Sequence, residues 1–279
     1  MFRSERNNIA TLKHKGFTLI ELLVVIAIIV ILLGILISSL QHVRKQARSV
    51  ACRSNLHQWA LAFAGYADQY DGSFWSGDLT NDGQEGYTWM IPLQAYYANE
   101  KKMLFCPSAK KLRKDGAPEP YAAWDTENTK EFSIKLAGSY GMNNWCTNPA
   151  PGVQFIHLIE PTQYNFRNIN NVKNANRIPL FLDCAFLEGK PFDTDGPPKD
   201  ISDISTYLTP GNQMKRFCIN RHDAFINGLF LDFSTRKIGL KKLWTLKWHK
   251  EFNTRNRYTR AGGATAETWP PWMRGLPEY

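Results

Sequence analysis

The segment Gly16-Phe17-Thr18-Leu19-Ile20-Glu21, with the apolar run behind it, decides how this chain is organised. Residues 22–37 carry no charged or strongly polar side chain, and the apolar character extends over residues 17–40. About 20 such residues in a helix are enough to cross a bilayer. Glu21 is the single charged residue of this span, and a lone carboxylate entering hydrocarbon costs about 2.5–3.5 kcal/mol. The sequence therefore predicts a transmembrane helix over residues 17–40 in which Glu21 has a functional role.

This segment resembles the processing site of type IV prepilins and type II secretion pseudopilins. The resemblance rests on Lys15, Gly16 and Phe17, on Glu21 four residues after Phe17, and on the uninterrupted apolar helix that follows. In that family the prepilin peptidase cuts after the glycine and methylates the new amino terminus. The resemblance implies a leader over residues 1–16, cleavage between Gly16 and Phe17, and N-methylation of Phe17, which keeps the charge of the amine. It also implies that Glu21 pairs with the amino terminus of a neighbouring subunit in a filament.

Charge counting does not settle the orientation in the membrane, because both flanks of the apolar run are basic. The resemblance implies a single-pass protein of the bacterial inner membrane, with the leader in the cytoplasm and the head in the periplasm or at the cell surface. An ordinary cleaved secretory signal is the competing interpretation. The run is long for such a signal, and Ser38-Ser39 make a poor cleavage site.

The helix is expected to continue beyond the membrane over residues 41–70. Apolar and aromatic residues recur there every three or four positions, which places them on one helix face. They are Cys52, Leu56, Trp59, Phe63, Tyr66 and Tyr70. Asp71-Gly72 is a typical helix end. We expect this face to pack on a globular domain.

Residues 71–279 are predicted to form that globular head, with a β-rich part over residues 138–252. The strand candidates are short, apolar or β-branched runs separated by turn residues, as in antiparallel sheets; they are residues 153–159, 178–183, 217–221, 225–232 and 237–240. A closing amphipathic helix is expected over residues 240–252. The predicted fold class is α+β and pilin-like: a long N-terminal transmembrane helix packed on a head with an antiparallel β-sheet.

The β-rich part shows a second resemblance, to the processing-associated H-x9-D-G module that accompanies prepilin leaders in large bacterial families. His222 is followed by nine residues and then Asp232. Phe233 stands where that family has glycine, although an Asp-Gly pair favours a tight turn with positive φ, which Phe resists. Either the turn is remodelled or the role of the motif has changed.

The five cysteines suit one or two disulfides in an oxidising compartment. The resemblance implies a bridge between Cys52 and Cys106, because the family often has a cysteine just past the membrane helix and another in a Cys-Pro-Ser segment. A buried free Cys52 is the alternative. None of the cysteines lies in a C-x-x-C pair, which argues against a zinc site.

No residue pattern requires catalysis. His222 and Asp232 suit contacts in a hairpin better than acid–base chemistry, and the sequence contains neither a nucleophile elbow nor an H-E-x-x-H motif. Asp193, Asp195 and Asp200 are weak candidates for a calcium site, because the EF-hand pattern is absent; a solvated acidic loop is the alternative. No other cofactor is expected.

The net charge of +9 is concentrated beside the membrane and in residues 236–260, which hold nine Lys and Arg against Glu251. Basic residues interleaved with Trp244 and Trp248 can bind nucleic acid or anionic headgroups. An amphipathic element with its tryptophans inward explains the pattern more simply, so no nucleic-acid partner is expected.

The sequence thus predicts a structural subunit of a pilus or type II secretion pseudopilus rather than an enzyme. Its expected partners are the prepilin peptidase, other pilin or pseudopilin subunits and the inner membrane. The alternative is a membrane-anchored surface protein whose head binds a polysaccharide or a secreted protein without assembling into filaments.

Overall fold

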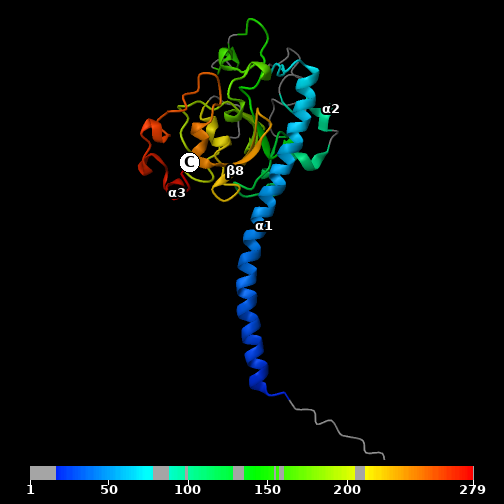
Figure 1. The fold of residues 1–279 in the computed structure, drawn as a ribbon, viewed down its shortest axis with the longest axis vertical. Coiled ribbons are helices and arrows are strands. Elements are labelled where there is room, and N and C mark those ends of the chain that lie inside the picture. The colour runs from blue at the N-terminus through cyan, green and yellow to red at the C-terminus, as the bar shows by residue number, and fades with distance from the viewer. Residues whose placement is uncertain are drawn as a thin grey trace, which may run out of the picture. The chain divides into compact units, whose positions relative to one another are not determined.

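A computed structural model describes residues 17–77, 88–97, 100–127, 135–153, 155–156, 160–204 and 211–278 (Figure 1). The chain divides into two compact units, Met1–Arg44 and Lys45–Tyr279. One continuous helix, α1 (Leu19–Gln69), contributes residues to both units. The predicted leader, residues 1–16, lies outside the described residues.

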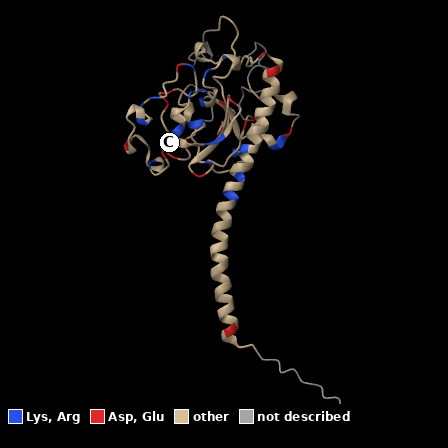
Figure 2. Ribbon diagram, viewed as in Figure 1, with Lys and Arg blue, Asp and Glu red and all other residues tan. Residues whose placement is uncertain are grey.

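Within the first unit, α1 has an apolar surface that no other described part of the chain covers. Its large apolar side chains from Leu19 to Val43 are all at least 43% exposed. Figure 2 shows no charged residue along this part of α1 between its first turn and Arg44. By length and composition the helix is able to cross a membrane, and the mean hydropathy of its most apolar 18-residue window is 3.4. This agrees with the predicted membrane-spanning segment.

Within the second unit, one face of α1 is buried in the head. Cys52, Leu56, Trp59 and Phe63 are fully buried, whereas Tyr70, the last residue of the predicted stripe, is 49% exposed. The Trp59 indole N–H donates a hydrogen bond of 2.8 Å to the carbonyl oxygen of Met103. The predicted helix and its packing face are therefore confirmed, except at the final turn.

The head is built on a five-stranded mixed sheet in the order β7-β3-β6-β8-β9. Neighbouring strands are antiparallel except β3 and β7, which are parallel. The bounds are β3 (Tyr140–Asn143), β6 (Pro179–Asp183), β7 (Glu188–Gly189), β8 (Phe225–Phe230) and β9 (Thr235–Gly239). This architecture confirms the α+β, pilin-like fold class.

Smaller elements surround this sheet. They are the strand pairs β1 (Trp124–Asp125) with β2 (Ala137–Gly138) and β4 (Phe155–Ile156) with β5 (Glu160–Pro161), and the short helices α2 (Gln94–Tyr97) and α3 (Pro271–Arg274).

The sheet separates two hydrophobic clusters, because adjacent strand residues point to opposite faces. Phe181 and Leu229 belong to the cluster that includes the buried face of α1. Their neighbours Leu182 and Phe230 belong to a second cluster, which includes the C-terminal part of the chain. Each face of the sheet therefore has its own core.

A buried histidine lies among aromatic rings on the second side. The ring of His249, a residue only 2% exposed, stacks on Tyr164 with 4.8 Å between ring centres and an interplanar angle of 10°. Trp145, Phe192 and Phe252 lie around it, with ring centres 4.9, 5.6 and 5.3 Å away. Neither ring nitrogen has a hydrogen-bond partner among the described residues.

Two expected elements take a different form. The predicted strand 217–221 is irregular and follows the 3-10 helix η6 (Gln213–Arg216). The predicted closing helix over 240–252 is limited to the 3-10 helix η7 (Leu240–Thr245). The Trp248 carbonyl oxygen accepts a hydrogen bond of 2.9 Å from the buried Asn143 side chain, so this tertiary contact replaces a helical one. The sequence period could not reveal that competition.

Candidate functional site

The start of α1 holds Glu21 in a defined position. The Thr18 backbone N–H and hydroxyl each donate a hydrogen bond of 2.8 Å to the same Glu21 carboxylate oxygen. In return, the Glu21 N–H lies 3.3 Å from the Thr18 hydroxyl oxygen. This reciprocal pattern is a capping box, which satisfies backbone N–H groups in the first helical turn. Phe17 precedes it and is 69% exposed, while Gly16 lies outside the described residues.

The capping box turns the Glu21 carboxylate back toward Thr18, the residue directly after Phe17. It therefore faces the end of the helix where a new amine would lie after cleavage behind Gly16. The backbone N–H groups at a helix N-terminus also favour a negative charge there.

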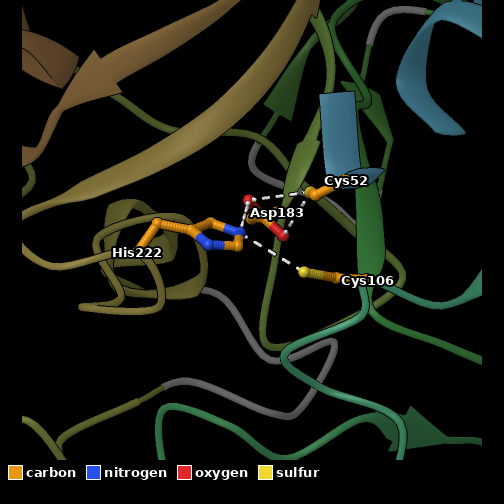
Figure 3. A group of neighbouring side chains, drawn as sticks. All are labelled: Cys52, Cys106, Asp183 and His222. Atoms are coloured by element: carbon orange, nitrogen blue, oxygen red, sulfur yellow. Dashed lines mark hydrogen bonds and ion pairs between the residues drawn. The ribbon is translucent and has the colours of Figure 1, made fainter. Parts of the chain in front are cut away.

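A second group of functional side chains lies in the interior of the head (Figure 3). It consists of Cys52, Cys106, Asp183 and His222, whose ligand atoms all lie within 4.8 Å of one another. Both cysteines and Asp183 are 0% exposed, and His222 is 6% exposed. Four separate parts of the chain supply these residues: α1, the loop after the 3-10 helix η1 (Lys101–Leu104), the end of β6, and the segment before β8.

Polar contacts join all four side chains in one network. The Cys52 sulfur lies 3.5 Å from each Asp183 carboxylate oxygen. The His222 Nε2 atom lies 3.1 Å from Asp183 Oδ2 and 3.3 Å from the Cys106 sulfur. One imidazole nitrogen, one carboxylate and two sulfur atoms therefore face a common centre.

Burial and mutual charge shift the ionisation of this group. Burial acts to raise the pKa of Asp183, but the charge and hydrogen bond of His222, with Arg221, lower it to about 2. Burial acts to lower the pKa of His222, but the Asp183 charge raises it to about 10. With nothing bound between them, Asp183 and His222 therefore form a buried ion pair at neutral pH.

The two thiols differ in their ionisation. Burial, followed by the hydrogen bond with Cys106, raises the pKa of Cys52 well above its usual range. Burial also acts to raise the pKa of Cys106, but hydrogen bonds with Cys52 and His222 bring it down to about 7. Cys106 is thus the more readily ionised sulfur of the pair.

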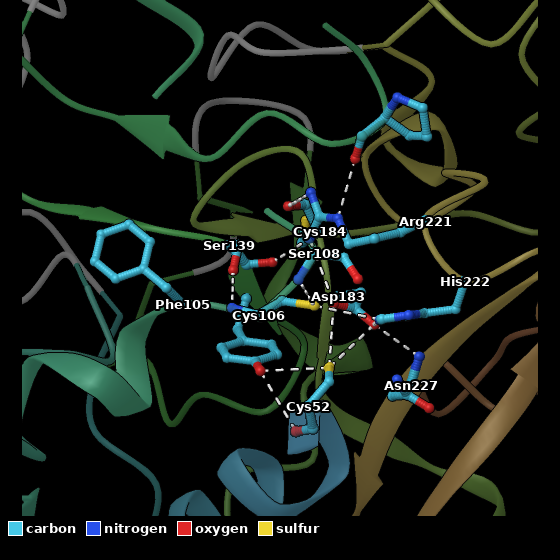
Figure 4. Close-up of polar contacts among 12 residues, drawn as sticks. Cys52, Phe105, Cys106, Ser108, Ser139, Asp183, Cys184, Arg221, His222 and Asn227 are labelled. Atoms are coloured by element: carbon cyan, nitrogen blue, oxygen red, sulfur yellow. Dashed lines mark hydrogen bonds and ion pairs between the residues drawn. The ribbon is translucent and has the colours of Figure 1, made fainter. Parts of the chain in front are cut away.

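Arg221 holds the surroundings of the group in place (Figure 4). Its guanidinium is fully buried and lies 3.4 Å from Asp183 Oδ1. It also donates hydrogen bonds to four backbone carbonyl oxygens, those of Pro120 (3.1 Å), Ala122 (3.1 Å), Ser139 (2.5 Å) and Cys184 (3.2 Å). One side chain therefore fixes two loops and the end of β6 around the carboxylate.

The predicted Cys52–Cys106 bridge is not formed in the structure. All five cysteines are buried free thiols. The structure nevertheless brings Cys52 and Cys106 together, and it adds Asp183 and His222 to them. The sequence thus paired the right cysteines, but the structure shows no covalent bond between them.

His222 and Asp232 do not contact each other, although Asp232 does lie in a hairpin turn, as its spacing indicated. His222 precedes β8 and Asp232 follows it, and six extended residues span about 20 Å. Asp232 instead accepts hydrogen bonds from the N–H and hydroxyl of Ser234 in the exposed turn between β8 and β9. Phe233 adopts φ +62°, so the positive φ of the turn persists without glycine, and its ring lies 6.1 Å from that of Phe63.

The weak calcium candidates are not brought together. Asp195 uses its Oδ2 atom to accept backbone N–H hydrogen bonds from Phe192, Gln213 and Met214. Asp200 accepts one from the Ser202 N–H, and Asp193 joins neither carboxylate in a ligand group among the described residues. Asp195 and Asp200 bind the backbone of the loop, which leaves the calcium expectation without support.

Asp183 and Arg221 were not predicted as site residues from the sequence. Asp183 ends a predicted apolar strand, and Arg221 directly precedes the His222 that was singled out. A charged residue at the end of a fully buried strand is a usable signal, because such a group needs partners. The identity of those partners depends on contacts 38 to 131 residues away in the sequence.

The comparisons with known proteins bear on the N-terminal site. No curated protein and no solved structure matches the chain. Residues 11–37 match the model of the prokaryotic N-terminal methylation motif, and this range includes Gly16, Phe17 and Glu21. The chain therefore carries the N-terminal methylation motif of prepilin-type proteins, with the long apolar helix α1 directly behind it.

Proposed function

We propose that this chain is a prepilin-type subunit that is cleaved after Gly16, N-methylated at Phe17 and assembled through α1 into a pilus or a type II secretion pseudopilus. The match of residues 11–37 to the methylation motif carries this proposal. The motif points to a structural subunit rather than an enzyme. Before assembly, α1 anchors the chain in the inner membrane, with its head on the periplasmic side or at the cell surface.

The exposed surface of α1 supports both the anchor and the filament. Full burial of one large apolar side chain away from water stabilises the buried state by about 1.5–3 kcal/mol. Leu19 to Val43 present such side chains on every face of the helix. A helix that is apolar all round needs a membrane or other apolar helices around it. Prepilin peptidase and other subunits of the same kind are the partners that this proposal requires.

The position of Glu21 supports a direct role in assembly. Its carboxylate faces the N-terminal end of the helix and is held there by Thr18. A carboxylate and a methylated amine that enter an apolar filament core each need a counter-charge. We infer that Glu21 of one subunit pairs with the Phe17 amine of its neighbour and thereby sets the stagger between them.

The first test is the mass of the N-terminal peptide, after coexpression with a prepilin peptidase and extraction from membranes. A peptide that begins at Phe17 and carries one methyl group is the expected result. A retained leader, or a start beyond Ser38, would overturn the proposed processing.

The second test separates the charge of Glu21 from its capping role. Glu21→Gln keeps an oxygen for the Thr18 N–H but removes the charge, and Thr18→Val removes the hydroxyl but keeps the carboxylate. We expect both variants to be cleaved, Glu21→Gln to assemble at least tenfold less filament, and Thr18→Val to assemble normally. Normal assembly of Glu21→Gln would show that the carboxylate serves only as a helix cap.

One observation favours a second function, binding of an acidic polysaccharide by the head. An open pocket of about 580 Å³ is lined by five basic residues, and no lining residue is acidic; the basic residues are Arg167, Lys173, Arg177, Lys247 and Lys250. Burial, followed by the charge of Arg167, lowers the pKa of Lys250, as expected where cations gather.

Retention on polygalacturonate and on neutral dextran tests this function. We expect salt-sensitive retention on the acidic polymer alone, because salt screens charge attraction. A Lys173→Gln/Lys250→Gln variant should lose it, whereas Lys110→Gln, outside this pocket, should keep it. Equal retention of both variants would contradict a role for the pocket.

A further inference from the structure

We propose that Cys52, Cys106, Asp183 and His222 form a four-coordinate zinc site that fixes α1 to the sheet of the head. The proposal concerns the interior of the head and does not depend on filament assembly. It rests on the donor atoms, their separations, the local charge and the groups behind the ligands.

The donor set suits zinc better than the other common metal ions. Two sulfur atoms, one imidazole nitrogen and one carboxylate oxygen face each other. Zinc in proteins takes these three donor types in tetrahedral sites, whereas calcium and magnesium require oxygen ligands. Thiolate ligands in a tetrahedral arrangement select zinc or iron–sulfur chemistry among the transition metals.

Three of the six separations between the donor atoms match a tetrahedron of the right size, and all six are within 4.8 Å. Bonds of about 2.3 Å to sulfur and about 2.0 Å to nitrogen and oxygen place sulfur about 3.5 Å from oxygen or nitrogen, and nitrogen about 3.3 Å from oxygen. The corresponding distances are 3.5 Å between Cys52 and Asp183, 3.3 Å between Cys106 and His222, and 3.1 Å between His222 and Asp183. These three pairs already have the spacing of a zinc tetrahedron, and the remaining pairs, within 4.8 Å, need to close to about 3.5–3.8 Å around the ion.

The ion also completes the charge balance. Two thiolates and the Asp183 carboxylate carry three negative charges, while His222 binds metal as a neutral imidazole. Arg221 supplies one buried positive charge beside Asp183, and a divalent ion supplies the remaining two. Unbalanced charge in the interior is costly, and the metal-loaded centre carries none.

The ligands are held from behind, as in established metal sites. Asp183 Oδ2 accepts the Asn227 N–H at 2.8 Å, and its Oδ1 faces Arg221. The Tyr140 hydroxyl lies 3.3 Å from the Cys52 sulfur, and the Ser108 N–H lies 3.5 Å from the Cys106 sulfur. Hydrogen bonds of this kind stabilise thiolate sulfur.

The site is structural because it is closed. Its four protein donors leave no position for water or substrate, and the ligand residues are 0–6% exposed. It joins residues that are 170 positions apart in the chain (222 minus 52). Bound zinc would also keep Cys52 and Cys106 reduced, because a coordinated thiolate pair is not available to form the bridge that its proximity otherwise invites.

Metal analysis of the full chain in detergent tests the proposal. We expect one zinc per chain in protein purified without chelator, and at least a tenfold lower content in Cys106→Ser. Cys146→Ser is the matched control, because it makes the same change at a buried cysteine outside the group and should keep the zinc. If Cys106→Ser fails to fold, chelator-treated wild-type protein titrated with Co²⁺ gives an independent readout.

The titration should produce the visible absorption bands of tetrahedral Co²⁺ and a sulfur-to-cobalt charge-transfer band. Both should reach their maximum at one equivalent of Co²⁺ per chain. Three results would each overturn the proposal. They are a Cys52–Cys106 disulfide in the purified chain, five free thiols with no bound metal before or after cobalt addition, and loss of zinc from Cys146→Ser as complete as that from Cys106→Ser.

Discussion

His249 should make the head sensitive to acid, and replacing it with phenylalanine should remove that sensitivity. Its ring is buried among Tyr164, Trp145, Phe192 and Phe252 and has no hydrogen-bond partner among the described residues. Burial, followed by the charge of Lys247, lowers the pKa of His249 to about 3. Lys190, whose ammonium lies 5.3 Å from the Trp145 ring centre, adds a second cation on this side.

The direction in which the free energy of unfolding changes with pH follows from proton linkage. The unfolded chain binds a proton at His249 below about pH 6.5, and the folded chain does so only near pH 3. Between these values the unfolded state holds more protons, so the free energy of unfolding falls as the pH falls. From pH 7.5 to pH 5 the loss assigned to His249 is about 2 kcal/mol. Any folded-state pKa below about 4 gives nearly the same loss, because at pH 5 the folded chain then binds almost no proton at His249 and only the pKa in the unfolded chain determines the loss.

Urea unfolding of the full chain in detergent, followed by tryptophan fluorescence at pH 5 and pH 7.5, measures this loss. Between the two pH values, His249→Phe should lose about 2 kcal/mol less than wild type. Phenylalanine is larger and can overpack the site, but that cost is the same at both pH values and cancels. His57→Gln, on an exposed face of α1, should behave like wild type. An acid loss in His249→Phe within about 0.5 kcal/mol of wild type would refute the reasoning.

Three further predictions follow from the same structure. Leu56→Ala, at a fully buried position, should lower the free energy of unfolding by about 2–5 kcal/mol. Leu61, on the opposite side of the same helix, is 64% exposed, so Leu61→Ala should change the free energy of unfolding by less than about 0.5 kcal/mol. Equal effects of the two variants in urea titrations would contradict the assigned helix face. Arg221→Met should cost about 3–5 kcal/mol, because it leaves Asp183 and four carbonyl oxygens without their donor, and Arg221→Lys should cost less; a loss below about 1 kcal/mol would show that water replaces the guanidinium. Phe233→Ile should be at least about 1 kcal/mol less stable than Phe233→Gly, because the position has φ +62° and a β-branched side chain resists this conformation; equal thermal midpoints would argue that the turn relaxes.

The sequence predicted α1 well because its signals are local. An apolar run and a repeat of three and four residues depend on neighbours within two helical turns. The same holds for β6 and β8, whose apolar residues are adjacent in the sequence and buried in the sheet. The strand β7 has two residues and pairs with β3 in parallel, so no periodic signal existed for it.

The interior site was only half predictable for the opposite reason. Cys52, Cys106 and His222 were singled out by motif, but as members of two separate pairs. Their meeting at Asp183 depends on β6 lying between β3 and β8 and on α1 crossing that part of the sheet, which no local pattern encodes. The H-x9-D spacing has the same limit, because it does not show that the whole of β8 separates His222 from the turn that holds Asp232.

The continuity of α1 has a mechanical consequence. Tension applied to the N-terminal part of α1 passes along the backbone of this 51-residue helix. The first buried residues of α1 are Ser49 and Cys52, so a pull on the helix loads their contacts with the head. Ser49 is tied to Asn227 by hydrogen bonds of 3.2–3.3 Å, and Cys52 reaches Asp183 at the end of the neighbouring strand. We therefore expect a pull on α1 to act on the same place where Cys52, Cys106, Asp183 and His222 join four segments of the head.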